Sequence, residues 1–213
     1  MTTALAAVGF LMAFTFFFRD LQVLETATEH VMPSLAGRSF PRVWDAGCAM
    51  GPESYSLAIL FAEKMGPFAF NNLRIHSTDL DEDGTFGETV ARGVYADQDL
   101  ERVPPEIRRR YFEPSGKTGL SRVIERVRNC IRFQRHDLLS LLPVGTDFGL
   151  VVCKNVLLHF QAAQRIAVIR MFHAALAPGG CLAMEQTQKL PGELEPLFRR
   201  VVPDCQLFRK VEG

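Results

Sequence analysis

Two glycines and a glutamate lie where an apolar run gives way to a helix-like run. Residues 43–46 are mostly apolar, and Gly47, Gly51 and Glu53 follow within seven positions. Glycine lets the backbone approach a ligand closely and adopt positive φ angles. A carboxylate near a helix start is stabilised by the helix dipole. The pattern therefore predicts a strand, a glycine turn and a helix, the arrangement with which open α/β sheets hold nucleotide-like ligands.

A second acidic residue ends the next strand-like run. Residues 73–79 finish at Asp79, about where the second strand of such a sheet offers a carboxylate to ribose hydroxyls. The alternative role for Asp79 is to cap the following helix, which suits an aspartate equally well. Together with the glycine turn, the ribose interpretation predicts a cofactor that contains adenosine.

The glycine spacing distinguishes between adenosine cofactors. A dinucleotide site uses Gly-x-Gly-x-x-Gly to seat a pyrophosphate on backbone amides. Here Gly47 and Gly51 are separated by three other residues, so that pyrophosphate site is missing. S-adenosylmethionine carries no phosphate and suits this spacing better. The alternative is that the two glycines only form a tight strand-to-helix turn in some other α/β protein and bind no cofactor.

The rest of the chain predicts the elements that would position these residues. A helix is expected over 52–64, a buried strand over 148–153, a helix over 162–176 and a strand over 181–184. This alternation is typical of the α/β class, with a doubly wound, mostly parallel sheet. Residues 101–134 break the rhythm with runs at 121–124 and 130–133, which predict a small antiparallel β insertion.

Composition limits the possible functions. The 213 residues suffice for one well-buried domain, and 24 Lys and Arg balance 24 Asp and Glu. No nucleic-acid partner is expected from this neutral balance. Residues 101–135 nevertheless carry ten Lys and Arg against four Glu, which predicts either a basic patch or a solvated helix face. The five cysteines and five histidines show no metal-ligand spacing, and the scattered cysteines favour a reducing, cytoplasmic location.

The uncharged start of the chain has two interpretations. Residues 1–18 contain no charge, and Arg19 and Asp20 follow immediately. They lack the basic flank of a signal peptide and only just reach the shortest membrane-spanning length. We therefore expect this segment to pack against the domain without stable membrane insertion. An interfacial anchor is the alternative.

Several motifs, in their order and spacing, resemble those of the CheR-type chemotaxis methyltransferases. The similarity extends from about Thr15 to the C-terminus. The motifs are Phe17-Phe18-Arg19-Asp20, Trp44-Asp45-Ala46-Gly47-Cys48 with Gly51 and Glu53, Tyr55-Ser56-Leu57-Ala58, Thr78-Asp79-Leu80-Asp81, Arg92-Gly93-Val94-Tyr95, Arg110-Tyr111-Phe112 and Lys154-Asn155-Val156-Leu157-Leu158-His159-Phe160.

The resemblance implies a Rossmann-like class I methyltransferase that uses S-adenosylmethionine, releases S-adenosylhomocysteine and esterifies glutamates on receptor helices. It implies one domain over 1–213, with an apolar arm over about 1–30 and a small β-subdomain over about 108–134. In some family members this subdomain docks a receptor tail, so the implied partner is a chemoreceptor-like helix or tail near residues 101–135. The implied site residues are Thr15 and Arg19 at the methyl-transfer site, Glu53 and the Gly47 to Gly51 turn at the methionine part, Asp79 at the ribose, Asp137 and Leu138 at the adenine, and Asn155 and Val156 beside the methyl group.

The sequence also departs from the family pattern. We recognise no counterpart of the family's N-terminal helical domain within these 213 residues, and the usual Arg-Asn-Val-x-Ile-Tyr-Phe has Lys154 and His159 at its first and sixth positions. The usual late His-Ser-Glu is replaced by residues 186–188, and Pro52 and Ser54 alter the usual Gly-Glu-Glu-Pro-Tyr-Ser. The cofactor positions match the family better than the acceptor positions do.

The chemistry of ester formation directs attention to Arg19 and His159. A glutamate side chain is already ionised at neutral pH, so its methylation needs orientation and exclusion of water rather than a base. The Arg19 guanidinium could hold a carboxylate through two parallel hydrogen bonds. Alternatively, Arg19 is only a surface cation that ends the apolar segment. His159 could be a packing residue, a hydrogen-bond donor, or a general base for a hydroxyl or amine.

These options leave three classes of function. The first is a methyltransferase that esterifies a protein carboxylate. The second is a methyltransferase for another protein site or a small molecule, which the missing helical domain favours. The third is a non-catalytic S-adenosylmethionine-binding module in signalling. Arg19 argues against this class, because cofactor binding alone does not require an arginine there.

Overall fold

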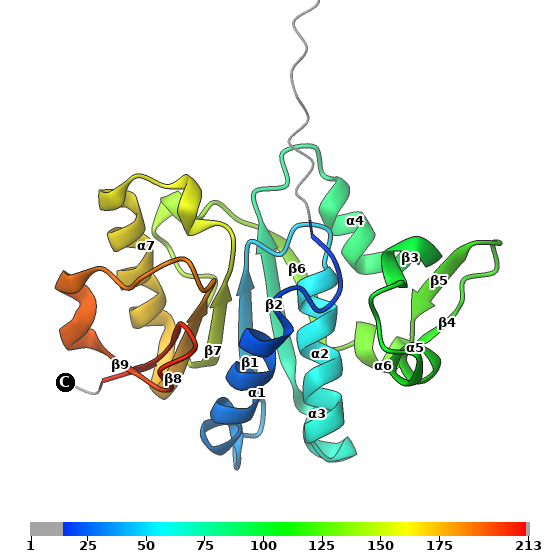
Figure 1. The fold of residues 1–213 in the computed structure, drawn as a ribbon, viewed down its shortest axis with the longest axis horizontal. Helices are drawn as coiled ribbons and strands as arrows, with labels where there is room; N and C mark the ends of the chain where they lie inside the picture. Colours follow the sequence, from blue (N-terminus) through cyan, green and yellow to red (C-terminus); the bar gives the residue numbers. More distant parts are fainter. Residues whose placement is uncertain (1–14, 212–213) are drawn as a thin grey trace, which may run out of the picture.

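The structure is a computed structural model that describes residues 15–211, and its centre is a seven-stranded sheet (Figure 1). The four pairings among the first five strands are parallel, and β10 pairs antiparallel with β8 and β9. In spatial order the strands are β6 (Ile131–Arg135), β2 (Arg74–Asp79), β1 (Arg42–Ala46), β7 (Phe148–Cys153), β8 (Leu176–Met184), β10 (Leu207–Lys210) and β9 (Phe198–Arg200).

Both faces of the sheet are covered, which confirms the doubly wound α/β prediction. Alternating residues of β1 enter opposite cores, because successive side chains of a strand point to opposite faces: Val43 lies in one cluster and Trp44 in the other. Buried side chains of α1 (Leu21–Leu35), α2 (Pro52–Lys64), α3 (Pro67–Asn72) and α4 (Thr85–Arg92) join the Val43 cluster. Those of α7 (Ala162–Ala175) and η4 (Gly192–Leu197) join the Trp44 cluster.

The strand order reverses between β1 and β7. From β1 the chain continues outward through β2 to β6, and it then returns to the other side of β1 to form β7 and β8. In open α/β sheets, ligands bind where the order reverses, beyond the carboxyl ends of the strands. The topology therefore places a binding crevice beyond Ala46 and Cys153, the last residues of β1 and β7.

A three-stranded antiparallel sheet projects beside the main one, in the order β3 (Val94–Ala96), β5 (Leu120–Val123) and β4 (Phe112–Pro114). Around it lie η1 (Asp97–Leu100), α5 (Pro105–Tyr111) and α6 (Glu125–Arg128). This sheet begins at Val94, whereas the insertion was expected within residues 101–134. The run 130–133, which we expected in the insertion, instead enters β6 at the edge of the main sheet, where Ile131 is buried in register with Ile75.

Other expectations can be compared with the described residues. The helices expected over 52–64 and 162–176 are α2 and α7. All five cysteines are buried free thiols. Within residues 15–211 no helix is both long and apolar enough to cross a membrane. Most of the apolar start, residues 1–14, lies outside the described part of the chain, but Phe17 is buried against the rings of Tyr95 and Phe112.

Phe17→Ala should lower the free energy of unfolding by about 3 to 5 kcal/mol, because it removes a fully packed ring from the core. Phe68→Ala is the matched control, since Phe68 is 85% exposed, and it should change stability by less than about 0.5 kcal/mol. Urea unfolding followed by circular dichroism measures both. Equal effects of the two substitutions would show that Phe17 does not pack as described.

Candidate functional site

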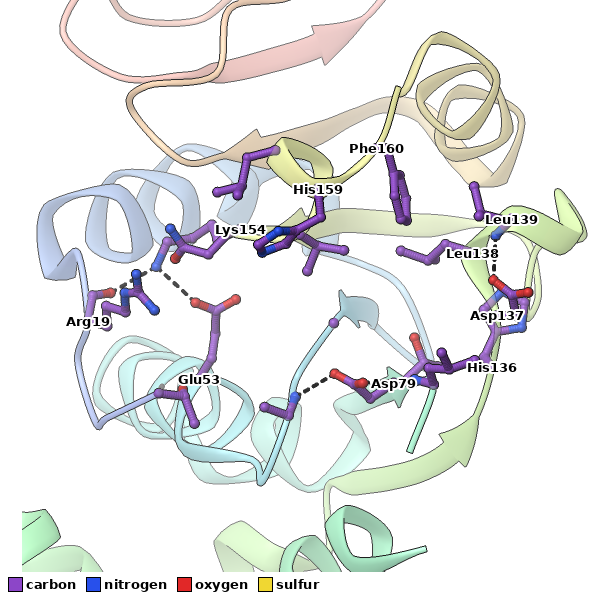
Figure 2. A pocket seen from close by; sticks show the side chains of 18 residues that line it. Arg19, Glu53, Asp79, His136, Asp137, Leu138, Leu139, Lys154, His159 and Phe160 are labelled. Atoms are coloured by element: carbon purple, nitrogen blue, oxygen red, sulfur yellow. Dashed lines mark hydrogen bonds and ion pairs between the residues drawn. The ribbon is translucent and has the colours of Figure 1, made fainter. Parts of the chain in front are cut away.

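A cavity of about 680 Å³ opens at the carboxyl ends of β1, β2, β6 and β7 (Figure 2). Most of the residues singled out from the sequence meet there, although they come from five separate segments of the chain. Those that line the cavity are Thr15, Arg19, Gly47, Glu53, Asp79, Asp137, Leu138, Asn155, Val156 and His159. Gly51 is placed differently: a Cβ atom on it would meet Val90 and Tyr95, so its role here is to let α2 begin against those side chains.

The turn after β1 passes very close to the segment after β7. Gly47 has a φ of +96°, and a Cβ atom there would lie 2.1 Å from Cγ2 of Val156. Both the backbone conformation and the lack of space therefore require glycine at position 47. The amide of Gly47 donates to the carbonyl of Thr78 at 2.7 Å, which fixes the turn beside the end of β2.

Asp79 organises the same turn through its side chain. Its Oδ2 accepts from the Ala49 amide at 2.8 Å, and its Oδ1 accepts from the Leu80 amide at 2.8 Å. It does not cap the next helix, because α4 begins at Thr85 with Gly84 as its N-cap residue. Each carboxylate oxygen has two lone pairs, so Asp79 keeps the capacity to accept hydroxyl groups from the cavity.

A buried cluster of charged groups lies beside Glu53. Nζ of Lys154 donates to Oε2 of Glu53 at 2.8 Å, and the Lys154 side chain is fully buried. Asp45 is also buried and accepts from the Ser54 hydroxyl at 2.5 Å, and Ser77 donates to Ser54 at 2.7 Å. Burial, and then the neighbouring Glu53 carboxylate, raise the pKa of Asp45 well above its usual value. The arrangement therefore makes the charged form of Asp45 less favourable in this cluster, while Glu53 is the partner of Lys154.

Arg19 and His159 reach the cavity from different elements. Arg19 lies in the turn before α1, and its guanidinium carbon is 6.0 Å from the centre of the Phe16 ring. His159 ends η3 (Leu157–His159) and is exposed. Figure 2 shows both side chains directed toward the same cavity. An arginine side chain and an exposed imidazole therefore line the same cavity.

The segment that carries His159 is held at both ends. Asn155 has a φ of +59°, and its backbone N–H donates a hydrogen bond to Oε2 of Glu185 at 3.1 Å. The carbonyl of Phe160 accepts from Arg165 at 3.3 Å. Sequence reasoning did not identify Glu185 or assign a role to Lys154. The sequence signal that could have identified them is their position, because Lys154 directly follows β7 and Glu185 directly follows β8.

The remaining wall of the cavity is mostly apolar. Leu80, Leu139 and Leu158 line it and are 44%, 39% and 47% exposed, and Leu138 is buried. Asp137 precedes η2 (Leu138–Ser140), and its Oδ1 accepts from the Leu139 amide at 2.8 Å. The combination of apolar walls with the carboxylates of Glu53, Asp79 and Asp137 suits a ligand that has a flat ring and polar ends.

Comparison with known proteins gives a consistent picture. A family model described as "CheR methyltransferase, SAM binding domain" matches residues 13–203. The chain is 28% identical over 195 residues to a probable chemotaxis protein methyltransferase of Rhizobium etli, covering 88% of this chain and 72% of that protein. It is 29% identical over 182 residues to the chemotaxis protein methyltransferase of Vibrio parahaemolyticus, covering 84% and 65% respectively.

One solved structure, a TehB-like SAM-dependent methyltransferase of Corynebacterium glutamicum, aligns with a TM-score of 0.45 at 17% identity, covering 86% of this chain and 85% of that one. The residues of the cavity themselves fit S-adenosylmethionine. A Cβ atom at position 47 would fill the closest approach of the backbone, and Glu53 and Asp79 provide acceptors without a pyrophosphate site.

Gly47→Ala should weaken binding of S-adenosylhomocysteine at least about tenfold, which corresponds to about 1.4 kcal/mol, because the new methyl group collides with Val156. Gly37→Ala is the matched control, since Gly37 also has a positive φ but has open space around it. It should cost about 1 kcal/mol of stability and leave the affinity unchanged. Titration calorimetry measures both, and wild-type affinity in Gly47→Ala would contradict the placement of the ligand beside this turn.

Proposed function

The chain belongs to the CheR methyltransferase family, and we propose that it transfers the methyl group of S-adenosylmethionine to a carboxylate of a protein. The product would be a methyl ester of a glutamate side chain, with S-adenosylhomocysteine as the second product. One observation carries this proposal: the cavity brings the acidic residues Glu53 and Asp79 together with the Arg19 guanidinium. The carboxylates suit the cofactor, whereas the guanidinium suits an anionic acceptor.

In this proposal the side of the cavity that carries Glu53 and Asp79 holds the polar ends of the cofactor. Glu53 receives the ammonium of the methionine part, and Gly47 lets that part lie against the backbone. Asp79 accepts the ribose hydroxyls while keeping its two bonds to the turn amides. Asp137 and Leu138 flank the adenine at the end of β6. When bound, S-adenosylmethionine supplies an electrophilic methyl group on a sulfonium.

The residues on the other wall are assigned to the reacting end. Asn155 and Val156 would line the space for the methyl group, and Thr15 and Arg19 line the same cavity. Arg19 would hold and orient the acceptor carboxylate toward the methyl group that S-adenosylmethionine would supply. Because the acceptor is already ionised, no base is required.

His159 is assigned as a hydrogen-bond donor to the acceptor carboxylate. Its exposure on the cavity wall supports this role, because the imidazole can reach a bound protein segment. The same exposure supports the second candidate function, in which His159 removes a proton from a hydroxyl or amine acceptor. The two functions differ in the product: an ester is cleaved by mild alkali, whereas an N-methyl or ether product is not.

The partner and location form part of the same proposal. The curated relatives described above are chemotaxis methyltransferases, which supports a chemoreceptor-like helix or tail as the acceptor. Such a partner would dock near residues 101–135, where Arg108 and Arg109 line a groove beside β4. A cytoplasmic location is proposed because all five cysteines are buried thiols. This chain spans only 65% of the length of the Vibrio relative. The acceptor of that whole protein is therefore only a proposal for this chain.

Arg19→Ala should leave S-adenosylhomocysteine affinity nearly intact and reduce methyl transfer by 2 to 4 powers of ten, on the order of 3 to 5 kcal/mol of lost orientation. Arg19→Lys should recover little activity, because an ammonium cannot form the paired hydrogen bonds of a guanidinium. The measurement is transfer of tritiated methyl groups into a host-cell lysate, followed by an alkali-lability test. Arg92→Ala, in an exposed helical ion pair, is the control and should behave as wild type. An unchanged rate in Arg19→Ala would contradict the acceptor role.

His159→Tyr should retain most of the activity if the acceptor is a carboxylate, because the phenol can still donate a hydrogen bond. His159→Phe should be weaker, since it keeps a ring but loses the donor. The same tritium assay compares the two variants at saturating cofactor. If His159→Tyr is inactive and the wild-type product survives alkali, the acceptor is a hydroxyl or amine and the ester proposal fails.

A further inference from the structure

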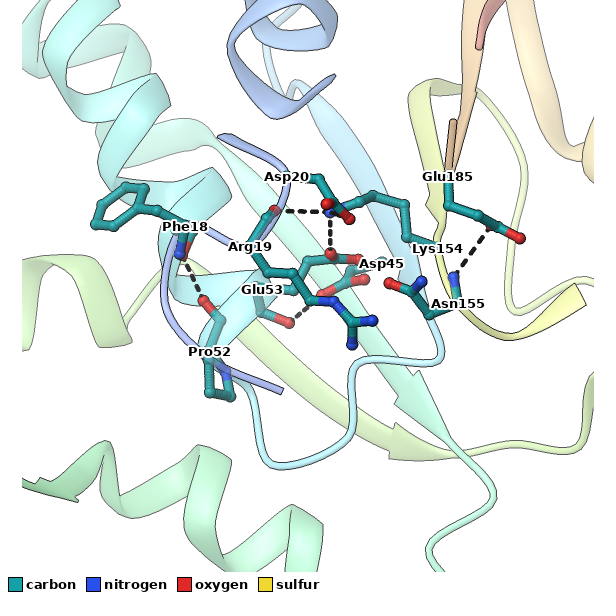
Figure 3. Close-up of polar contacts among 11 residues, drawn as sticks. Phe18, Arg19, Asp20, Asp45, Pro52, Glu53, Lys154, Asn155 and Glu185 are labelled. Carbon is teal, nitrogen blue, oxygen red and sulfur yellow. Dashed lines mark hydrogen bonds and ion pairs between the residues drawn. The ribbon is translucent and has the colours of Figure 1, made fainter. Parts of the chain in front are cut away.

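The buried ammonium of Lys154 contacts two parts of the molecule that are far apart in sequence (Figure 3). Its Nζ donates to Oε2 of Glu53 on α2 and to the main-chain carbonyl of Arg19, both at 2.8 Å. A third acceptor, Oδ2 of Asp20, lies at 3.5 Å. An ammonium has three N–H donors, so Lys154 has one donor for each of these acceptors.

The turn that carries Arg19 is strained on both sides. Phe18 has a φ of +58° and Asp20 a φ of +51°, and neither is a glycine. Such conformations are unfavourable for residues with a Cβ atom and persist only where surrounding contacts hold them. Two contacts do so here: the Phe18 amide donates to the Ser56 hydroxyl at 2.8 Å, and the Arg19 carbonyl accepts from Lys154. The position of the Arg19 backbone therefore depends on where the Lys154 ammonium lies.

The position of that ammonium depends in turn on Glu53. The Lys154 side chain is fully buried and that of Glu53 is 10% exposed, so neither charge can turn to solvent without a large rearrangement. Asp20 is 42% exposed and farther away, which makes it the weaker partner. Glu53 consequently fixes the ammonium, and the ammonium fixes the Arg19 carbonyl.

We propose that Lys154 is a positioning residue that couples occupancy of the cofactor site at Glu53 to the ordering of the turn that carries Arg19. This inference rests on the proposed function in one respect, namely that Glu53 receives the cofactor. A cofactor ammonium on Glu53 restrains that carboxylate, and Lys154 passes the restraint to the Arg19 backbone. The acceptor clamp is then fully formed when the methyl donor is bound.

Hydrogen exchange followed by mass spectrometry tests the coupling without any acceptor. The reporter peptide spans residues 16–24, in which the amides of Phe18 and Val23 are hydrogen-bonded. A reference peptide contains the Leu80 amide, which bonds to Asp79 and reports the ribose end of the site. In the wild-type protein, saturating S-adenosylhomocysteine should slow exchange of both peptides, by about tenfold for residues 16–24.

Lys154→Met keeps the bulk of the side chain and removes its charge and donors. At saturating S-adenosylhomocysteine its reference peptide should still be protected, whereas exchange of residues 16–24 should slow by less than about twofold. Lys154→Arg should restore the protection, because a guanidinium can again bridge Glu53 and the Arg19 carbonyl. Lys210→Met is the matched control: Lys210 donates to the carbonyl of Leu176 on the sheet at 2.7 Å, and its loss should leave both peptides as in wild type.

Exchange without ligand covers the case in which Lys154→Met no longer binds S-adenosylhomocysteine. The proposal then requires residues 16–24 to exchange faster than in wild type, because the bond to the Arg19 carbonyl is lost. Unchanged exchange there, or wild-type protection of residues 16–24 in ligand-saturated Lys154→Met, would overturn the coupling. If the wild-type protein itself fails to bind S-adenosylhomocysteine, the proposed function fails, and the ligand-free comparison still decides whether Lys154 holds the turn.

Discussion

The candidate site depends on how closely the turn after β1 approaches the segment after β7. The strand order reverses between these two strands, so their chains diverge at the carboxyl ends and leave a crevice. Gly47 and Val156 are in contact across it, and no Cβ atom fits at position 47. The crevice is therefore closed at its base by backbone against a branched side chain. The space left above this contact is lined by groups from both sides of the reversal.

Electrostatic balance imposes a second constraint on this space. Buried charges are unfavourable unless they are paired and hydrogen-bonded. Asp45, Glu53 and Lys154 are all buried, and burial together with Glu53 raises the pKa of Asp45. Lys154 pairs with Glu53, whereas Oδ2 of Asp45 accepts from the Ser54 hydroxyl, which in turn accepts from Ser77. The cluster can thus present a carboxylate to the cavity without leaving a buried cation unpaired.

Local sequence patterns predicted the elements better than their arrangement. The start of α2 followed from Gly51 and Pro52, its end followed from Gly66 and Pro67, and the glycine turn followed from Gly47 and Gly51. The β6 run was assigned to the insertion, because a short apolar stretch does not reveal which strand it pairs with. Pairing depends on distant partners such as Ile75. The family resemblance supplied the site residues at the other strand ends, since spacing alone did not place Asp137 or Asn155 beside Gly47.

The roles of Lys154 and Glu185 could not be predicted for a related reason. A charged residue after an apolar strand has no assigned partner until the fold brings one near. Lys154 finds its partners 101 and 135 positions earlier in the chain, at Glu53 and Arg19. The Arg19 turn is also tied to the small sheet, because Phe17 packs edge-on against Tyr95 at 4.9 Å. Tyr95 in turn donates to the carbonyl of Met50 in the glycine turn at 2.8 Å. The small sheet thus braces both the Arg19 turn and the glycine turn, so it is part of the scaffold of the site whatever partner it contacts.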